Sequence, residues 1–245
     1  MNKVFFYPFT IVYYLVFISI LIFFHLIQVF CYRLLGYHAH KISVDWLNFF
    51  LLRCLNLLGT SFEFSNPFEM PKEGPLIIVS NHQSTYDISP IIWYFRKYHP
   101  KFISKSELGS GIPSVSYNLR YGGSILIDRN HPDLALKKIG DFGARIKKNK
   151  WSAVIFPEGT RSKDGLPKKF HSKGLMKLFE EIPNANVVAL SINNSWKLAR
   201  YRYFPIPMGT KVNLKVQGIF RLKEQEPLHF FNQVEQLVAK GVKND

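Results

Sequence analysis

The sequence has few acidic residues and almost no cysteine. Asp and Glu together number 17 against 32 Lys and Arg, so the formal net charge is +15. Such a basic chain favours a polyanionic partner, either nucleic acid or the surface of an anionic membrane. The two cysteines, Cys31 and Cys54, lie in apolar surroundings and form no C-x-x-C pair. The sequence therefore predicts no disulfide framework and no zinc knuckle, and a reducing cytosolic face is the simplest compartment.

Several common catalytic and nucleotide-binding motifs are also missing. The chain contains no G-x-S-x-G, no G-x-x-x-x-G-K-[ST], no H-E-x-x-H and no complete G-x-G-x-x-G. These absences argue against a serine nucleophile on an elbow, a P-loop, a zinc-protease helix and a dinucleotide-binding fingerprint. The remaining residues favour a histidine base that acts directly on a substrate hydroxyl, with no covalent intermediate.

A long N-terminal stretch lacks charged residues altogether. Residues 4–32 contain no Asp, Glu, Lys or Arg, and the stretch exceeds the roughly 20 residues that a helix needs to cross a bilayer. A signal peptide would have a shorter apolar region and a cleavage site of small residues, and neither is present. The sequence therefore predicts association with the cell membrane rather than a buried helix of a soluble protein.

A second apolar stretch, residues 44–59, is interrupted by polar side chains and predicts an amphipathic helix at the membrane interface. Two arrangements remain open: one true membrane span, or a pair of helices that dips into one leaflet. Basic residues follow the first apolar stretch (Arg33, Lys41, Arg53) more than they precede it (Lys3). The positive-inside rule then favours a body on the cytoplasmic face.

From residue 74 onward, strand-like and helix-like runs alternate. The predicted strands cover residues 75–80, 101–105, 123–128, 152–156, 187–192 and 211–217. The predicted helices cover residues 88–98, 113–121, 132–148, 170–182 and 229–242, and Asn130 is a candidate cap for the third of them. This alternation predicts an α/β fold with a mostly parallel central sheet flanked by helices. A shift in composition near residues 60–74 predicts two domains, membrane-anchoring helices over 1–62 and a body over 63–245.

Ligand sites of such sheets lie where strands end and loops begin. The octapeptide SNHQSTYD, residues 80–87, follows one predicted strand and places His82 five positions before Asp87. Neither a helix nor a strand puts such a pair on one face, so the two side chains can meet only across a turn. Ser84 and Asp87 also have the spacing of a capping box. Asp87 can therefore be either the partner of His82 or only the end of a helix.

Two further loops carry charged residues at predicted strand ends. Lys105 and Arg129 each end a strand, and FPEGTRS (156–162) follows another with Glu158 and Arg161. Arginine offers planar, bidentate donors to a phosphate, and lysine offers a point charge. Each loop taken alone is also compatible with an ordinary surface turn. Three such loops at one edge of a sheet favour a binding site.

Three ordered blocks, NHQSTYD, KSEL…IP…GGSILIDR and FPEGTRS, span residues 81–162. In these blocks the chain resembles the glycerophospholipid acyltransferase family, typified by 1-acylglycerol-3-phosphate acyltransferase. The resemblance implies that the histidine activates the acceptor hydroxyl and that the aspartate orients the histidine. It assigns catalysis to His82 and Asp87, placement of the acceptor glycerol to Glu158, Gly159 and Thr160, and phosphate binding to Arg161, Lys105 and Arg129.

The reaction implied by the resemblance is transfer of an acyl chain to lysophosphatidate, giving phosphatidate. The donor would be a thioester of coenzyme A or of acyl carrier protein, with no metal and no other cofactor. Two positions depart from the family pattern, Ser116 where Gly is common and Ala189 where Pro is expected. The donor, the chain length and the acceptor headgroup therefore stay open, with other lysophospholipids and lyso-aminolipids as alternatives. A membrane-anchored basic binding protein without catalysis is the rival from another class.

One segment interleaves aromatic and basic residues, SWKLARYRYF (195–204). It fits a stacking patch for nucleic acid, a surface that contacts lipid headgroups, or a plain surface hairpin. Because an apolar segment begins the chain, we expect membrane lipids and not nucleic acid as its partners.

Overall fold

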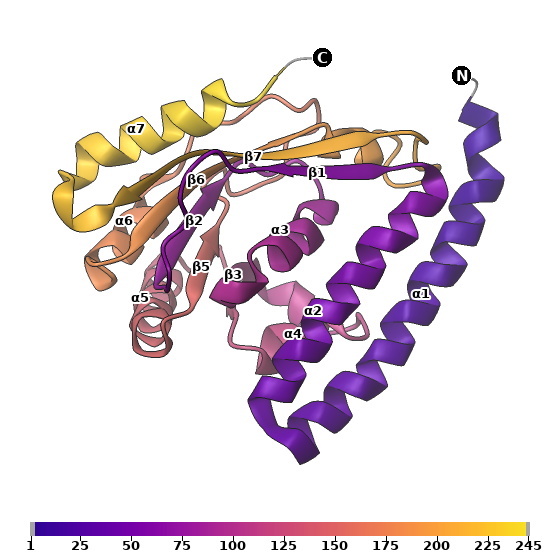
Figure 1. Cartoon of the computed structure of the whole chain (residues 1–245), viewed down its shortest axis with the longest axis horizontal. Coiled ribbons are helices and arrows are strands. Elements are labelled where there is room, and N and C mark those ends of the chain that lie inside the picture. The colour runs from indigo at the N-terminus through magenta and orange to yellow at the C-terminus, as the bar shows by residue number, and fades with distance from the viewer. Residues whose placement is uncertain (1–2, 244–245) are drawn as a thin grey trace.

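A sheet of seven strands forms the centre of the protein in this computed structural model, which describes residues 3–243 (Figure 1). The strands are β1 (Ser61–Ser65), β2 (Leu76–Ser80), β3 (Pro100–Lys105), β4 (Ile125–Ile127), β5 (Ser152–Ile155), β6 (Asn186–Asn193) and β7 (Lys211–Arg221). Their order across the sheet is β1-β7-β6-β2-β5-β3-β4. Neighbouring strands run parallel except β6 and β7, which are antiparallel. The prediction of a mostly parallel α/β sheet is confirmed.

Helices cover both faces of this sheet, as Figure 1 shows. They are α1 (Phe6–Phe30), α2 (Gly36–Leu55), α3 (Ile88–Tyr94), α4 (Val115–Tyr121), α5 (Pro132–Asn149), α6 (Ser172–Glu181) and α7 (Pro227–Lys240). Successive side chains of β2 point to opposite faces. Ile77 packs in the core under α5, α6 and α7, and Ile78 packs in the core shared with α1, α2 and α3. Both faces of β2 are thus buried, which explains why its sequence is continuously apolar.

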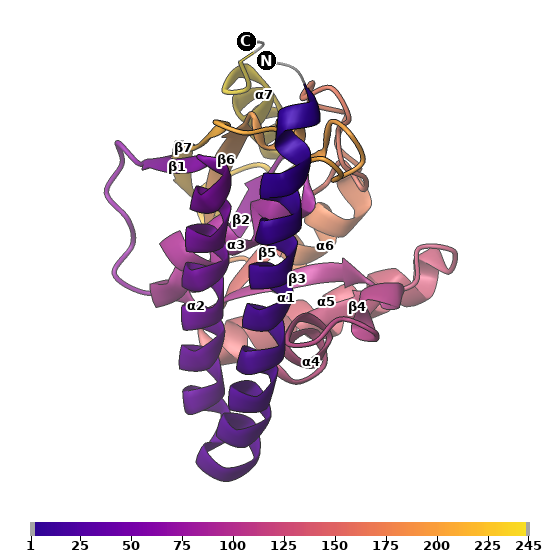
Figure 2. The same ribbon diagram turned by 90° about the vertical axis from the view of Figure 1, so that its right-hand side faces the viewer.

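The two N-terminal helices form an antiparallel pair that lies along one side of the body (Figures 1 and 2). A π-helical turn at Cys31–Leu35 joins them, and Gly36 reverses the chain with φ +82°, a value that favours glycine. An 18-residue window within Lys3–Leu58 has a mean hydropathy of 2.4, and many large apolar side chains of α1 are exposed, such as Leu15 and Leu26. This N-terminal apolar pair identifies the protein as membrane-associated.

The helix pair also contributes to the body of the protein. Tyr13 of α1 is fully buried and lies in the same hydrophobic core as Ile78 of the central strand. Val44 and Cys54 of α2 belong to that core as well. The predicted boundary between residues 62 and 63 falls inside β1. The division into an anchor over 1–62 and a body over 63–245 stays a prediction.

Several predicted elements differ in detail from the structure. The edge strand β1 was not predicted, because its five residues hold only two apolar side chains, Phe62 and Phe64, too short an alternation to indicate a strand. The predicted helix over 88–98 ends at Tyr94, and a short 3₁₀ turn, Arg96–Tyr98, replaces its last residues. The residue that precedes α5 as its cap is His131 and not Asn130, because Pro132 occupies the first position of the helix.

We expect Phe142→Ala to destabilise the body strongly. Phe142 of α5 is fully buried in the core between the sheet and α6, so its removal leaves a cavity, at about 3–5 kcal/mol. Denaturant unfolding in detergent measures the change. Leu134→Ala on the same helix is the matched control, since this side chain is 52% exposed. Equal destabilisation by the two variants would contradict the position of Phe142 in the core.

Candidate active site

The loop after β2 makes the turn that the pair of His82 and Asp87 requires. Ser84 lies in extended conformation just before a 3₁₀ turn, Thr85–Asp87, that leads into α3. Its hydroxyl accepts a hydrogen bond from the Tyr86 amide at 3.1 Å, and its own amide donates to Asp87 at 2.9 Å. This is the capping box that the sequence predicted. The tight turn also brings Asp87 back under the imidazole of His82.

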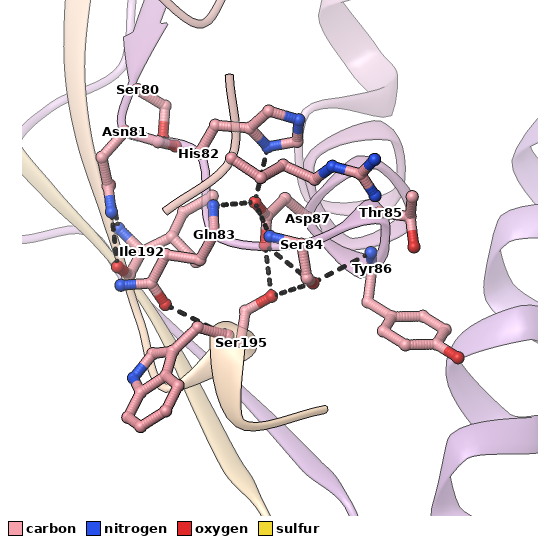
Figure 3. A network of polar contacts seen from close by, with 12 residues as sticks. Ser80, Asn81, His82, Gln83, Ser84, Thr85, Tyr86, Asp87, Ile192 and Ser195 are labelled. Carbon is pink, nitrogen blue, oxygen red and sulfur yellow. Dashed lines mark hydrogen bonds and ion pairs between the residues drawn. The ribbon is translucent and has the colours of Figure 1, made fainter. Parts of the chain in front are cut away.

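A hydrogen bond of 2.8 Å joins His82 Nδ1 to Asp87 Oδ2 (Figure 3). Since an ionised carboxylate only accepts, Nδ1 carries the proton and Nε2 presents its lone pair. The ring of His82 stacks on Phe156, with 4.1 Å between centroids and 16° between planes. The stacked ring and the Asp87 contact hold the imidazole in one orientation. A histidine in this state is equipped to take a proton from a hydroxyl at Nε2.

Asp87 is fully buried and is surrounded by donors. The amides of Gln83 and Ser84 donate to Oδ2 at 2.7 and 2.9 Å, beside the contact from His82. The hydroxyl of Ser195 donates to Oδ1, and the two serine hydroxyls, of Ser84 and Ser195, also contact each other. A buried carboxylate needs such partners, because desolvation otherwise penalises its charge. The arrangement keeps a negative charge directly behind the imidazole.

Hydrogen bonds of the backbone and of side chains join the loop FPEGTRS and the residues just after it to the His82 loop. The Ser162 amide donates to the His82 carbonyl at 2.7 Å, and the Gln83 side chain donates to the Gly165 carbonyl at 3.0 Å. The His82 amide in turn donates to Glu158 Oε1 at 3.3 Å. Gly159 has φ +72°, so the turn uses a conformation that favours glycine. The first and third sequence motifs therefore form one structural unit.

Glu158 is buried, with 3% of its surface exposed. Burial raises its pKa to about 7, and the amides of His82 and Lys168 oppose the shift only in part. This carboxyl is therefore poised between its neutral and charged forms near neutral pH. A buried carboxyl with a raised pKa beside a candidate base is typical of functional sites.

Arg129, Arg161 and Lys105 all lie at the same edge of the sheet, but their side chains differ in the contacts that they make. Arg129 Nη1 donates to the Gly159 carbonyl, which puts this side chain on the FPEGTRS loop. Arg161 is exposed on the same loop, and its Nη1 donates to the Tyr203 hydroxyl at 2.7 Å. Lys105 ends β3 and is exposed. Within residues 3–243, no hydrogen bond links the Lys105 side chain to the FPEGTRS loop that Arg129 contacts.

Sequence reasoning missed three participants. Ser195 and Tyr203 both come from the aromatic-basic segment 195–204, and Lys168 donates to the hydroxyl of Thr160 at 3.0 Å. The sequence held a signal for Ser195, because segment 195–204 begins just after a predicted parallel strand. That strand, β6, ends beside β2, and the Asn81 side chain bridges them with bonds of 2.7 and 2.8 Å to the Ile192 backbone.

The fold and the joined loops define a class of α/β proteins with a His–Asp pair at the carboxyl edge of the sheet, in which the aspartate is buried and the histidine is partly exposed. Residues 61–193 match the Acyltransferase family, and the chain belongs to this family.

Its relatives carry a consistent name. The 1-acyl-sn-glycerol-3-phosphate acyltransferase of Helicobacter pylori strain J99 is 35% identical over 155 residues, 60% of this chain and 62% of the relative. The protein of that name from Pseudomonas aeruginosa is 33% identical over 131 residues, 53% of this chain and 49% of the relative. The matched segments thus span less than two thirds of these relatives' own length.

Similarity of fold extends further than similarity of sequence. The crystal structure of the 1-acyl-sn-glycerophosphate acyltransferase PlsC from Thermotoga maritima superposes with a TM-score of 0.81. The two chains are 24% identical, and the match covers 98% of this chain and 96% of the other. The match therefore includes the N-terminal helix pair as well as the sheet.

We expect Glu158→Gln to alter how stability depends on pH. Because the pKa of Glu158 rises from 4.5 to about 7 on folding, the folded state holds this proton more tightly, and stability is lost as pH rises between these values. Glutamine stays neutral throughout. The difference in melting temperature, variant minus wild type, should grow from pH 4.5 to about 7 and then level off. Thermal scans across this range measure it.

Glu69→Gln is the control, since Glu69 is exposed. A pH-independent difference for Glu158→Gln would show that folding leaves the pKa of this carboxyl unshifted, against this expectation.

Proposed function

We propose that the chain is a 1-acylglycerol-3-phosphate O-acyltransferase. It transfers an acyl chain from an acyl thioester to the free hydroxyl of lysophosphatidate and yields phosphatidate and a free thiol. The observation that carries this proposal is the hydrogen bond from His82 Nδ1 to buried Asp87, which leaves Nε2 to take a proton beside the loop that carries Arg161 and is contacted by Arg129. Membership of the Acyltransferase family and the names of its relatives support it.

The His–Asp pair can carry the chemical step. Nε2 of His82 accepts the proton of the acceptor hydroxyl while the hydroxyl oxygen attacks the thioester carbonyl carbon. The imidazolium that forms is stabilised by the Asp87 carboxylate at 2.8 Å. As the carbon–sulfur bond breaks, the proton passes from His82 to the leaving thiolate. Protons and electrons balance without a covalent enzyme intermediate.

The remaining residues of the site are assigned to the acceptor. Glu158, Gly159 and Thr160 line the turn beside His82 and place the glycerol, and Arg161 with Arg129 and Lys105 binds the phosphate. Arginine suits this role because its planar guanidinium donates two parallel hydrogen bonds to a phosphate. Acylation of another lysolipid would use the same base with a different headgroup. A binding protein without catalysis would leave the oriented imidazole without a purpose.

The helix pair explains how a lipid acceptor reaches this site. Exposed apolar side chains on α1 and α2 enter the membrane, and the net charge of +15 holds the body on anionic headgroups. We assign the body to the cytoplasmic face, with coenzyme A or acyl carrier protein presenting the acyl chain from that side. Residues 1–62 then form the anchor and residues 63–245 the catalytic domain.

His82→Ala should lower turnover by orders of magnitude. Loss of the general base is expected to lower the rate roughly 10²–10⁴-fold. The purified protein in detergent, supplied with lysophosphatidate and palmitoyl-coenzyme A, is followed by thiol release and phosphatidate formation. His131→Ala is the matched control, because His131 also contacts an aspartate, Asp128, at 2.8 Å but is exposed.

Turnover close to the wild-type rate in His82→Ala would exclude His82 as the base. An inactive wild type that gains activity with acyl carrier protein or another lysolipid would keep the reaction class and change a substrate. Inactivity with every combination would favour the binding protein.

The cytoplasmic assignment predicts which side of a membrane exposes the body. With an epitope tag after the last residue, protease should remove the tag in inverted vesicles and leave it intact in right-side-out vesicles. The reason is the excess of Arg33, Lys41 and Arg53 after the first apolar stretch. Cleavage only in right-side-out vesicles would place the body on the opposite face.

A further inference from the structure

The hydroxyl of Tyr203 has a place in the site that the proposed catalytic residues do not account for. It accepts a hydrogen bond from Arg161 Nη1 at 2.7 Å, and the guanidinium lies 5.9 Å from the centroid of the same tyrosine ring. The amide of Thr85, inside the turn between His82 and Asp87, donates to the same oxygen at 3.3 Å. One phenol thus connects the His–Asp turn with the arginine of the third loop.

The donors around this oxygen leave its own proton unused. A tyrosine hydroxyl can accept at its lone pairs and can donate one hydrogen. Arg161 and Thr85 both donate to it, so the O–H bond must point elsewhere. Among residues 3–243, no acceptor is found for that proton. It is therefore free to reach a ligand bound next to the guanidinium.

Tyr203 occupies this place with a backbone conformation that is unfavourable for its residue type. Arg202 and Tyr203 have φ of 53° and 69°, the left-handed region that side chains other than glycine rarely adopt. Contacts with α1 retain the segment there. Tyr14 donates to the Tyr203 carbonyl at 2.7 Å, and the Ile206 amide donates to Thr10 at 2.9 Å. The ring of Tyr203 also meets Tyr86 edge-to-face, with centroids 5.8 Å apart.

We propose that Tyr203 belongs to the subsite for the acceptor phosphate. Its hydroxyl oxygen fixes the guanidinium of Arg161, and its hydroxyl proton is donated to a phosphate oxygen at the same time. Arg161 is exposed and flexible by nature, so fixing it beforehand removes an ordering cost from binding. The tyrosine therefore discriminates in favour of acceptors that carry a phosphate. This inference rests on the proposed function.

Tyr203→Phe tests the inference because it removes the hydroxyl and keeps the ring with its contacts to Arg161 and Tyr86. The KM for lysophosphatidate should rise on the order of tenfold, since a hydrogen bond to a charged group is lost. The kcat and the KM for palmitoyl-coenzyme A should stay unchanged. With 1-monoacylglycerol, which lacks the phosphate, the variant and the wild type should have equal kcat/KM. Tyr201→Phe on the same segment is the matched control.

A double mutant separates a role through Arg161 from a general structural one. In the background of Arg161→Ala, the change Tyr203→Phe should add less than its effect alone, because the guanidinium that it holds is gone. Full additivity, an equal loss with both acceptors, or an unchanged KM in Tyr203→Phe would each overturn the inference.

Binding of lysophosphatidate without any acyl donor keeps the two proposals distinguishable. Equilibrium titration should show weaker binding to Tyr203→Phe than to wild type or Tyr201→Phe. If the wild type binds in this way but does not transfer an acyl chain, the proposed function fails and the phosphate subsite stands. If the wild type transfers the acyl chain and Tyr203→Phe binds as tightly, the subsite fails alone. A wild type that neither binds nor transfers overturns both.

Discussion

The carboxylate of Asp87 is the group on which the geometry of the site depends. It is fully buried, so its charge must be met by donors, and these come from parts of the chain far apart in sequence. The amides of Gln83 and Ser84 fix the turn, and Ser195 reaches it from 108 residues away. The Asp87 carboxylate thus fixes the turn between β2 and α3, holds the distant segment of Ser195 in place and orients His82. One oxygen of Asp87, Oδ2, serves both its capping role and its proposed catalytic role, since it accepts from the Ser84 amide and from His82 Nδ1.

Much of this arrangement could be predicted from the sequence because it is local. The run PLIIVS is apolar on both faces, which only a central strand explains, and Ser84 and Asp87 carry the spacing of a capped helix start. Since parallel strands end at one edge, the loops with His82 and Glu158 were expected to lie close together. The contact of 3.3 Å between the His82 amide and Glu158 confirms their proximity, while their catalytic roles stay predictions.

The features that escaped prediction depend on pairing over long distances. β1 has only Phe62 and Phe64 as apolar residues, and it becomes a strand because β7 lies beside it. Ser195 and Tyr203 lie in a segment whose composition fitted three interpretations equally well. Its position is fixed by contacts with α1 and with the His82 loop, such as the bond from Tyr14. No local pattern specifies contacts of this kind.

The helix pair sets the position of the body relative to the membrane as well as anchoring it. Because Tyr13 shares a core with Ile78, the depth at which α1 sits in a membrane also fixes the depth of the central sheet. Segment 195–206 lies between α1 and the loop of His82, with hydrogen bonds to both. The position of the site relative to the bilayer is thus set by side-chain packing and not by the length of a flexible linker.

The position of β1 at the edge of the sheet bears on how the protein is made. Its neighbour in the sheet is β7, which leaves the ribosome long after β1 because chains grow at roughly 5–20 residues per second. The apolar helices therefore leave the ribosome while the strand that follows them still lacks its partner. Ser195, which completes the surroundings of Asp87, also emerges after the helices. The surroundings of Asp87 can therefore be completed only after both apolar helices have been made.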